Sequence, residues 1–273
     1  MMCMGLSAYL VGAVQMTSTE DRARNLDTAL RLVEEAAGQG ARLVGLPENF
    51  AFMGPEEARL AGAETLEGPT LGAVRELARR RRIHVLAGSI AERTDDPRRT
   101  SNTSALVGDD GSLLAVYRKI HLYDVAIPDG ARYAESEGVR PGDQVVLAAT
   151  ALGRIGLSIC YDLRFPELYR RLAALGAEIL TIPSAFTLYT GKDHWEVLVR
   201  ARAVENLAYV LAPAQVGKHG PRRETFGNAM IVDPWGVVLA RCPDGEGVCL
   251  APFRRERLER VRRELPALKH RRL

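Results

Sequence analysis

Three side chains that could do chemistry stand where apolar runs of the sequence end. Glu48 follows LVGLP, Lys119 follows LLAVYR and Cys160 follows GLSI. Sites in α/β proteins are built at the ends of sheet strands, so we expect these groups to converge there. A thiol, a carboxylate base and an ammonium would together suit acyl transfer. The backbone N–H of Tyr161, near the start of a predicted helix, would be a second donor to the oxyanion, beside Lys119.

Each of these residues also has an ordinary structural interpretation. A free cysteine at a strand end is more often buried and inert. A lone glutamate usually lies at the surface or caps a helix, and a lone lysine is usually solvated. Taken one at a time, the three residues therefore leave catalysis and structure both open, and only their combination favours catalysis.

The elements that must position these residues are indicated by hydrophobic periodicity. In the first third of the chain, strands and helices alternate, which favours parallel pairing through right-handed crossovers. Ser18 or Thr19 is expected to cap the first helix, with Asp21 in its first turn. The predicted strands here span 9–16, 41–50 and 84–92, and the predicted helices lie around 26–37 and 71–78.

The rest of the chain adds antiparallel hairpins to this α/β pattern. Turn signals at 109–111, near Gly153 and over 233–236 predict hairpins spanning 101–122, 144–160 and 226–242. No Pro/Ser-rich linker interrupts the pattern, so we expect one domain over residues 1–273. The remaining predicted helices span 166–175, 193–206 and 254–265, and the remaining predicted strands span 178–186, 208–216 and 247–253.

Composition narrows the class of protein. The 273 residues include 37 basic and 34 acidic side chains, for a net charge of +3, so nothing suggests nucleic acid or a membrane as a partner. The four cysteines lack CxxC spacing, which argues against a disulfide framework or a zinc site, and a Cys242–Cys249 pair is disfavoured. The N-terminal apolar stretch has no basic region before it, and we expect a cytoplasmic enzyme.

Four motifs in order resemble the nitrilase superfamily of carbon–nitrogen hydrolases. They are GLPENF around Glu48, YRKIHLYD around Lys119, RYAESEGVRPGD around Glu135 and GLSICYDLRFPEL around Cys160. The resemblance implies a four-layer α-β-β-α sandwich with a Glu-Lys-Cys triad and Glu135 as a second glutamate. It also implies that no metal or organic cofactor is needed, and that the chain forms a homodimer or a higher homo-oligomer.

Within that superfamily the sequence looks most like the Nit branch. That likeness implies an amidase for the side amide of a small keto-acid amide such as deaminated glutathione, working through a cysteine thioester and releasing ammonia. Arg164 would clamp the substrate carboxylate, or instead pair with Asp162 or Glu167 as scaffolding. Ser184 and Phe186 would line the pocket or pack in the core.

Three other functions stay open. The first is an omega-amidase acting on 2-oxoglutaramate. The second is another hydrolase with the same triad, either a nitrilase or a carbamoylase. The third belongs to a different class, a non-catalytic member that binds a metabolite or a partner protein through the same pocket.

Overall fold

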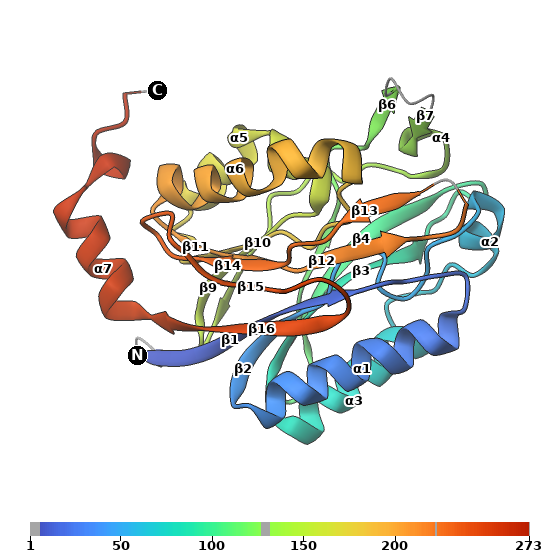
Figure 1. The fold of residues 1–273 in the computed structure, drawn as a ribbon, viewed down its shortest axis with the longest axis horizontal. Coiled ribbons are helices and arrows are strands. Elements are labelled where there is room, and N and C mark those ends of the chain that lie inside the picture. Colours follow the sequence, from blue (N-terminus) through green and yellow to red (C-terminus); the bar gives the residue numbers. More distant parts are fainter. Residues whose placement is uncertain (1–5, 127–131, 222, 273) are drawn as a thin grey trace.

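Two β-sheets pack face to face and helices cover both outer surfaces (Figure 1). The computed structural model describes residues 6–126, 132–221 and 223–272. Helices α1 (Arg22–Gly38) and α3 (Pro69–Arg81) cover one sheet, and α5 (Pro166–Ala174) and α6 (Leu188–Asn206) cover the other. The predicted four-layer α-β-β-α sandwich is therefore confirmed.

The first sheet carries Glu48 and Lys119 at strand ends. Its strand order is β13-β12-β1-β2-β3-β4-β5, with β16 also paired to β1. Strands β12, β1, β2 and β3 run parallel, whereas β4 is antiparallel to β3 and β5 is antiparallel to β4. The strands are β1 (Ala8–Met16), β2 (Ala41–Gly45), β3 (His84–Arg93), β4 (Thr100–Val107), β5 (Leu113–Arg118), β12 (Ala214–Lys218), β13 (Glu224–Phe226) and β16 (Gly247–Arg254).

The second sheet carries Cys160 in the same way. Its order is β15-β14-β11-β10-β9-β8, and its three central strands are parallel. The strands are β8 (Leu147–Thr150), β9 (Gly153–Leu157), β10 (Ile179–Thr181), β11 (Tyr209–Ala212), β14 (Met230–Val232) and β15 (Val238–Arg241).

Shorter elements lie around these layers. A two-stranded ribbon, β6 (Asp124–Ala126) and β7 (Arg132–Ala134), and the short helices α2 (Glu56–Ala61) and α4 (Glu135–Gly138) cluster at one side of the molecule. A 3₁₀-helix (Cys160–Arg164) follows β9. Near the C-terminus, α7 (Arg255–Glu264) and a 3₁₀-helix (Ala267–Lys269) lie at the opposite side of the molecule from this ribbon (Figure 1), where Leu258 of α7 packs into the core.

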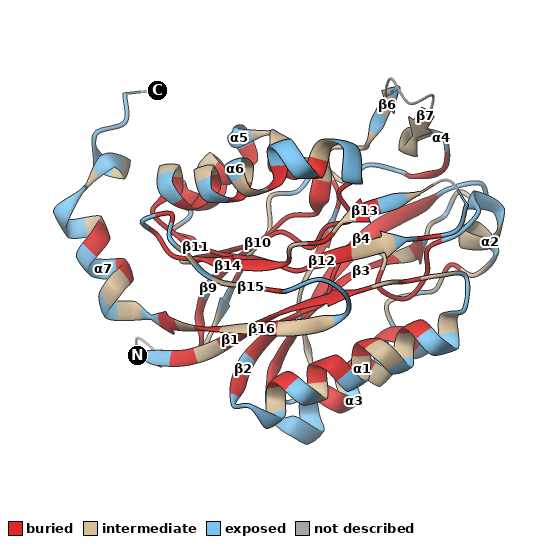
Figure 2. Cartoon of the chain, in the orientation of Figure 1, coloured by how far each residue is buried: buried red, intermediate tan, exposed pale blue. Residues whose placement is uncertain are grey.

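Apolar side chains on both faces of the first sheet explain the layering. In β1, Val11 and Ala13 face the second sheet, whereas Val14 and Met16 face α1 and α3. Successive side chains of a strand point to opposite faces, so a continuous apolar run requires cover on both sides. The buried residues accordingly form two cores, one between the sheets and under α6, the other under α1 and α3 (Figure 2).

Two helix starts differ from the prediction. Asp21, not Ser18 or Thr19, is the N-cap of α1, because its side chain accepts a hydrogen bond from the Arg24 N–H at 3.0 Å. Helix α6 begins at Leu188 rather than Asp193. Its Gly191 lies so close to Phe226 that a Cβ there would come within 2.3 Å of that side chain, so this glycine serves packing and does not break the helix.

Several predicted strands are shorter than their apolar runs. The run 208–216, expected as one strand, is two strands in different sheets, since Pro213 between β11 and β12 has no N–H for a ladder. The runs 41–50 and 178–186 form strands only over Ala41–Gly45 and Ile179–Thr181, and the remainder of each run leads into the site. Helices α2 and α4 and the β6–β7 ribbon were not predicted.

The cysteines and helices show two further features. Cys242 and Cys249 are both buried and form no disulfide, although their thiols are hydrogen-bonded to each other, while Cys3 lies outside the described residues. Across the described ranges, we find no helix with the length and apolar character needed to span a bilayer.

Candidate active site

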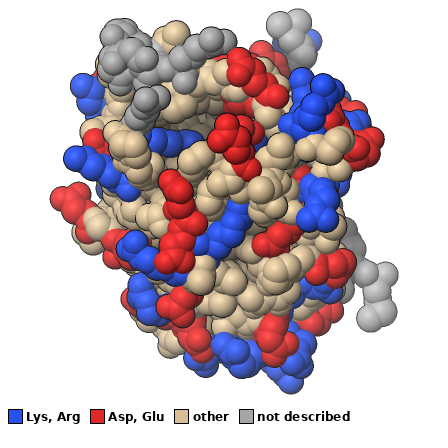
Figure 3. Space-filling view, turned by 90° about the vertical axis from the view of Figure 1, so that its right-hand side faces the viewer, with Lys and Arg blue, Asp and Glu red and all other residues tan. Residues whose placement is uncertain are grey.

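A cavity of about 750 Å³ opens where the strands of both sheets end. It lies beside α2, α4 and the β6–β7 ribbon, on a side of the molecule whose surface is visibly hollowed and bears both acidic and basic side chains (Figure 3). That volume is within the range of small-molecule sites. Glu48, Lys119, Glu135 and Cys160 all line it, so the structure brings together these four residues singled out from the sequence.

Lys119 lies between two carboxylates at the buried end of the cavity. Its Nζ donates to Glu48 Oε1 at 2.9 Å and to Glu135 Oε2 at 2.8 Å. Glu135 is the first residue of α4, and the N–H of Tyr123 also donates to its Oε2, at 2.7 Å. Lys119 and Glu48 are each about 2 % exposed, so their pairing is shielded from water.

A fourth polar residue of this group, Asn102, was not identified from the sequence. Its Nδ2 donates to Glu48 Oε1 at 3.0 Å and to Glu135 Oε1 at 3.1 Å, which bridges the two carboxylates. Its own carbonyl oxygen is buried and has no hydrogen-bond partner among the described residues. An asparagine within the β4 run SNTSAL carries no sequence signal, because only the antiparallel return of β4 brings it to this edge. Glu48, Asn102, Lys119, Glu135 and Cys160 are called the buried cluster below.

The charges of the buried cluster stabilise one another. Burial by itself would lower the pKa of Lys119, but the negative charges of Glu135 and Glu48 outweigh it and hold that pKa above its ordinary value. Burial would likewise raise the pKa of Glu135, yet the Lys119 ammonium and its hydrogen bonds lower it. Lys119 therefore stays a cation, which is the form that stabilises an oxyanion.

Cys160 is held in a backbone conformation that few residues other than glycine adopt. Its φ is 46°, at the junction between β9 and the 3₁₀-helix. Such a conformation is strained and persists only where the surroundings enforce it, typically at functional sites. Here the N–H of Cys160 donates to the Pro183 carbonyl at 3.0 Å, which ties the turn to the end of β10. The sharp turn points the thiol into the cavity beside Glu48.

Asp162 anchors this turn from inside the core. It is fully buried and accepts hydrogen bonds from the Ile159 N–H at 2.8 Å and the Tyr117 hydroxyl at 2.6 Å. His121 also contacts it, through Nδ1 at 2.7 Å, and its ring stacks on Phe165. Asp162 is therefore a structural support for the cysteine turn and does not pair with Arg164.

The thiol of Cys160 rests in its neutral form. Burial, the negative charge of Glu48 and a hydrogen bond with that carboxylate raise its pKa well above the ordinary value. Attack by sulfur therefore requires transfer of the thiol proton to a base. Glu48 is in place for that transfer, because it is the carboxylate that contacts the thiol.

Hydrogen bonding distinguishes the two oxygens of Glu48. Oε1 accepts from both Lys119 and Asn102, so its two lone pairs are occupied. Oε2 accepts from the Ala185 N–H at 3.0 Å, which leaves one lone pair for a proton. The arrangement therefore makes Oε2 the proton acceptor of the buried cluster.

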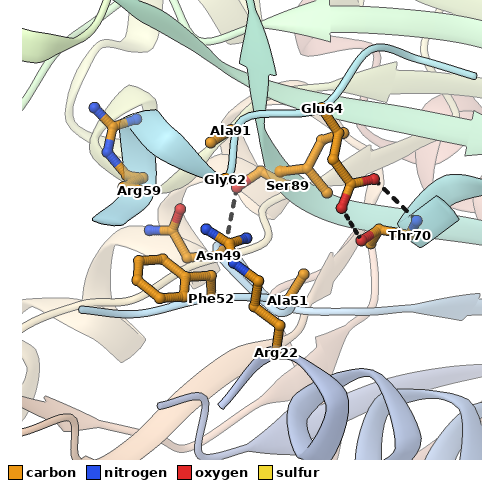
Figure 4. A pocket seen from close by; sticks show the side chains of 11 residues that line it. Arg22, Asn49, Ala51, Phe52, Arg59, Gly62, Glu64, Thr70, Ser89 and Ala91 are labelled. Carbon is orange, nitrogen blue, oxygen red and sulfur yellow. Dashed lines mark hydrogen bonds between the residues drawn. The ribbon is translucent and has the colours of Figure 1, made fainter. Parts of the chain in front are cut away.

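The backbone around Glu48 is fixed by close packing. Asn49, at φ 56°, donates its N–H to Ser89 Oγ at 2.9 Å, and Gln215 donates to the Glu48 carbonyl at 3.0 Å. A Cβ at Gly88 would lie 1.9 Å from the Pro47 carbonyl oxygen, so only glycine permits this approach. Asn49 also borders a second, much smaller cavity of about 10 Å³, room for about one water molecule (Figure 4).

One wall of the cavity is aromatic and cationic. The residues that form it, Tyr123, Tyr133, Tyr161, Arg164 and Arg223, are called the aromatic wall below. The ring centroids of Tyr161 and Tyr123 are 5.0 Å apart, and the Arg164 guanidinium lies 5.9 Å from the Tyr161 ring. Tyr161 is the second residue of the 3₁₀-helix, whose first N–H groups have no acceptor inside the helix, so its N–H is available to a ligand.

Of the three residues expected to line the pocket, two do so and the third does not. Arg164 and Phe186 both line the cavity, with the guanidinium 5.2 Å from the Phe186 ring. Among the described residues, neither Asp162 nor Glu167 forms an ion pair with Arg164; it contacts His194 at 3.3 Å instead. Ser184, in contrast, does not line the cavity, because its hydroxyl turns into the core and donates to the Ile182 carbonyl.

The described residues include no ready-made set of metal ligands. Within residues 6–126, 132–221 and 223–272, no group of three His, Cys, Asp or Glu side chains is arranged to hold an ion. Near Cys160 the two carboxylates are occupied by Lys119 and Asn102. The arrangement can instead perform acyl transfer, with a thiol, a base and a fixed cation around one cavity.

Comparison with known proteins agrees with this geometry. The model of the carbon–nitrogen hydrolase family matches residues 10–263. A protein of Synechocystis sp. named deaminated glutathione amidase is 46 % identical over 269 residues, which cover 97 % of this chain and 99 % of that protein.

Solved structures give the same result. The crystal structure of the Caenorhabditis elegans NitFhit protein superposes with a TM-score of 0.93 at 39 % identity, covering 98 % of this chain and 66 % of that one. Saccharomyces cerevisiae Nit3, a member of branch 10 of the nitrilase superfamily, superposes with a TM-score of 0.88 at 31 % identity, covering 98 % and 97 %. The chain therefore belongs to the carbon–nitrogen hydrolase family, within the nitrilase superfamily.

Proposed function

We propose that this carbon–nitrogen hydrolase is an amidase that cleaves the side amide of a small 2-oxo-acid amide, with deaminated glutathione as its substrate. The observation that carries the substrate is the 46 % identity, over nearly the whole of both chains, to a protein named deaminated glutathione amidase. The cavity supports it, since about 750 Å³ is ample for a tripeptide-sized amide.

The buried cluster supports a two-step reaction. The sulfur of Cys160 attacks the amide carbon while its proton passes to Glu48 Oε2. Lys119 and the Tyr161 N–H stabilise the resulting oxyanion. Glu48 then protonates the amide nitrogen, the carbon–nitrogen bond breaks and a thioester remains. Water, deprotonated by Glu48, hydrolyses that thioester to the acid and restores the thiol. Glu135 and Asn102 hold Lys119 and Glu48 in place throughout.

The leaving group depends on which amide is hydrolysed, and this corrects the expectation that ammonia is released. The scissile amide of deaminated glutathione is secondary, because its nitrogen belongs to the cysteinyl residue. Hydrolysis therefore releases 2-oxoglutarate and cysteinylglycine, and not the ammonia that we expected from the sequence. Ammonia would be released only from a primary amide such as 2-oxoglutaramate. The two substrates can thus be told apart by their second product.

Arg164 is proposed to bind the carboxylate of the 2-oxo acid. Its guanidinium lies at the aromatic wall beside Phe186, in the same cavity as Cys160. A planar guanidinium pairs with a carboxylate through two parallel hydrogen bonds, which fixes orientation as well as charge. Phe186 would pack against the aliphatic part of the acyl chain.

The proposal extends to the organisation, location and assembly of the enzyme. One domain over residues 1–273 is supported by β1, which pairs with strands near both ends of the chain. A cytoplasmic location is supported by the free thiols of the described cysteines; fractionation of cells tests it.

A homodimer or higher homo-oligomer is supported by an exposed apolar surface. Val197 and Val204 on α6 and Trp235 and Val237 in the β14–β15 turn are each at least 46 % exposed. The Arg200 Nε donates to the Gly236 carbonyl at 2.9 Å, which joins the helix to the turn. An apolar patch of this kind favours association. Light scattering of the wild type and of Val204→Glu tests it, and a monomeric wild type would contradict it.

The decisive experiment incubates the purified enzyme separately with deaminated glutathione and 2-oxoglutaramate. Chromatography with mass detection measures 2-oxoglutarate, cysteinylglycine and ammonia, with Cys160→Ala as the control. The proposal expects faster turnover of deaminated glutathione, abolished in the variant. Turnover of 2-oxoglutaramate alone would make the protein an omega-amidase. Turnover only of a nitrile or a carbamoyl amino acid would make it another hydrolase of the superfamily.

A different measurement tests the alternative that the protein binds a ligand without catalysing a reaction. Because Cys160 rests as a buried neutral thiol, slow alkylation by iodoacetamide would not prove that it is inert. Rapid acid quench during turnover and intact-mass measurement should instead show the acyl-enzyme. A bound substrate with no acyl adduct and no product would favour binding without catalysis.

A further inference from the structure

Arg223 is a second cationic residue of the aromatic wall without a carboxylate partner. It follows the β12 strand and lines the same cavity as Cys160. Within the described part of the chain, its Nε is buried with no hydrogen-bond partner and no carboxylate lies within ion-pairing distance of it. A buried guanidinium N–H that has no acceptor is costly, so its presence at a cavity indicates that a ligand supplies the acceptor.

Arg59, another arginine that lines this cavity, behaves differently. Arg59 contacts the Glu56 carboxylate, the Thr100 hydroxyl and the Gly138 carbonyl, so its donors are occupied. The remaining cationic side chains that line the cavity are Lys119, which belongs to the buried cluster, and Arg164. Arg164 and Arg223 are therefore the two cations available to a substrate.

A continuous row of rings connects Arg223 to the nucleophile. Tyr161 directly follows Cys160, and its ring lies 5.0 Å from that of Tyr123. Tyr123 lies 5.1 Å from Tyr133, and the guanidinium of Arg223 lies 6.0 Å from the Tyr133 ring. A three-residue chain spans about 10 Å when extended. A substrate of that length, with its scissile amide over Cys160, can place its leaving group along this row, directed toward Arg223.

We propose that Arg223 binds a carboxylate carried by the leaving group of the substrate, so that the cavity selects amides whose departing amine ends in a carboxylate. This inference rests on the proposed function, in which Arg164 binds the carboxylate of the acyl group. The two guanidiniums would then hold a dicarboxylate at both ends, with the scissile amide over Cys160. Glu20 also lines the cavity, and its negative charge disfavours a position beside it for the second carboxylate.

The test compares two substrates that differ only at the far carboxylate. One is deaminated glutathione, and the other is its analogue in which the glycyl carboxylate is capped as a carboxamide. Both are assayed with the wild type, Arg223→Gln and Arg223→Lys by 2-oxoglutarate release. Arg98→Gln, which removes one arginine from a site with an 86 % exposed side chain, is the matched control.

The expected result is a preference of the wild type for the free carboxylate of about 10- to 100-fold in kcat/KM, mainly through KM. Arg223→Gln should reduce that preference to near one, Arg223→Lys should keep part of it, and Arg98→Gln should keep all of it. A wild type that cleaves both substrates equally, or a preference that survives in Arg223→Gln, would overturn the inference and leave the proposed function standing. A wild type that cleaves neither substrate would overturn both.

Discussion

The buried cluster and the aromatic wall treat charge in opposite ways. In the buried cluster, Lys119 is hydrogen-bonded to two carboxylates, and Asn102 bridges the same two groups. In the aromatic wall, Arg164 and Arg223 contact rings and have no carboxylate partner among the described residues. Groups that carry out a reaction need fixed positions, which saturated hydrogen bonding provides. Groups that recognise a charged substrate must keep their donors free for it.

Removing the nucleophile should have the largest effect. Cys160→Ala is expected to lower kcat by at least about 10⁴-fold, since no other group can form the thioester. Initial rates of 2-oxoglutarate release measure it. Cys242→Ala, which removes a buried thiol that does not line the cavity, should keep near-wild-type activity. Residual activity above a tenth of wild type in Cys160→Ala would disprove the nucleophile.

Breaking the central ion pair tests the buried cluster as a structural unit. Lys119→Met should lower the free energy of unfolding at pH 7 by about 3–5 kcal/mol, because it leaves two buried carboxylates facing each other. Urea titration measures the change, with Lys269→Met at an exposed position as the control. The difference from wild type should shrink at low pH, where the carboxylates become protonated. An unchanged stability at pH 7 would mean that the cluster relaxes or admits water.

Asn102 offers a smaller perturbation of the same cluster. Asn102→Asp keeps the shape of the side chain but replaces its donor by a third carboxylate, and Asn102→Ala removes the donor alone. A hydrogen bond to a charged group contributes about 1.5–3 kcal/mol, so kcat should fall roughly 10- to 100-fold in Asn102→Ala and further in Asn102→Asp. KM should change little, because Asn102 positions Glu48 and Glu135. A loss confined to KM would place Asn102 in substrate binding instead.

On the aromatic wall the expected effects are on binding. Arg164→Gln should raise KM for deaminated glutathione by about tenfold and change kcat less, because a partly exposed guanidinium–carboxylate pair is worth little more than 1 kcal/mol. Arg164→Lys should be intermediate, since an ammonium keeps the charge but not the planar fork. Steady-state kinetics on both substrates measures the split. A large fall in kcat with unchanged KM would move Arg164 into the catalytic machinery.

The smallest expected effect is the dependence of stability on pH. The pKa of Glu135 is lowered in the folded enzyme, so the unfolded chain binds its proton more readily. This contribution is present above the ordinary glutamate pKa of about 4.3 and is lost as the pH falls towards the folded value. Melting temperatures of wild type and Glu135→Gln between pH 7 and 3.5 should therefore converge as the pH falls. Parallel curves would contradict the shift.

Local sequence patterns were sufficient for much of the fold and for the reactive residues. The continuous apolar run of β1 required cover on both of its faces, and the turn signals near Gly111, Gly153 and Gly236 marked real hairpins. Glu48, Lys119 and Cys160 could be singled out because each reactive group ends an apolar run. These features depend only on residues a few positions apart, so they can be recognised in the sequence without knowledge of the fold.

The remaining features depend on contacts between distant segments. Asn102 and Glu48 are 54 residues apart, and Ala185 and Glu48 are 137 apart, so no local pattern could show that Glu48 Oε2 is left to accept a proton. The exclusion of Ser184 from the cavity and the row of rings leading to Arg223 likewise follow from packing. The sequence thus specified which groups could react, and tertiary structure decided which were saturated and which stayed free, because hydrogen-bond partners are assigned only when the strands meet.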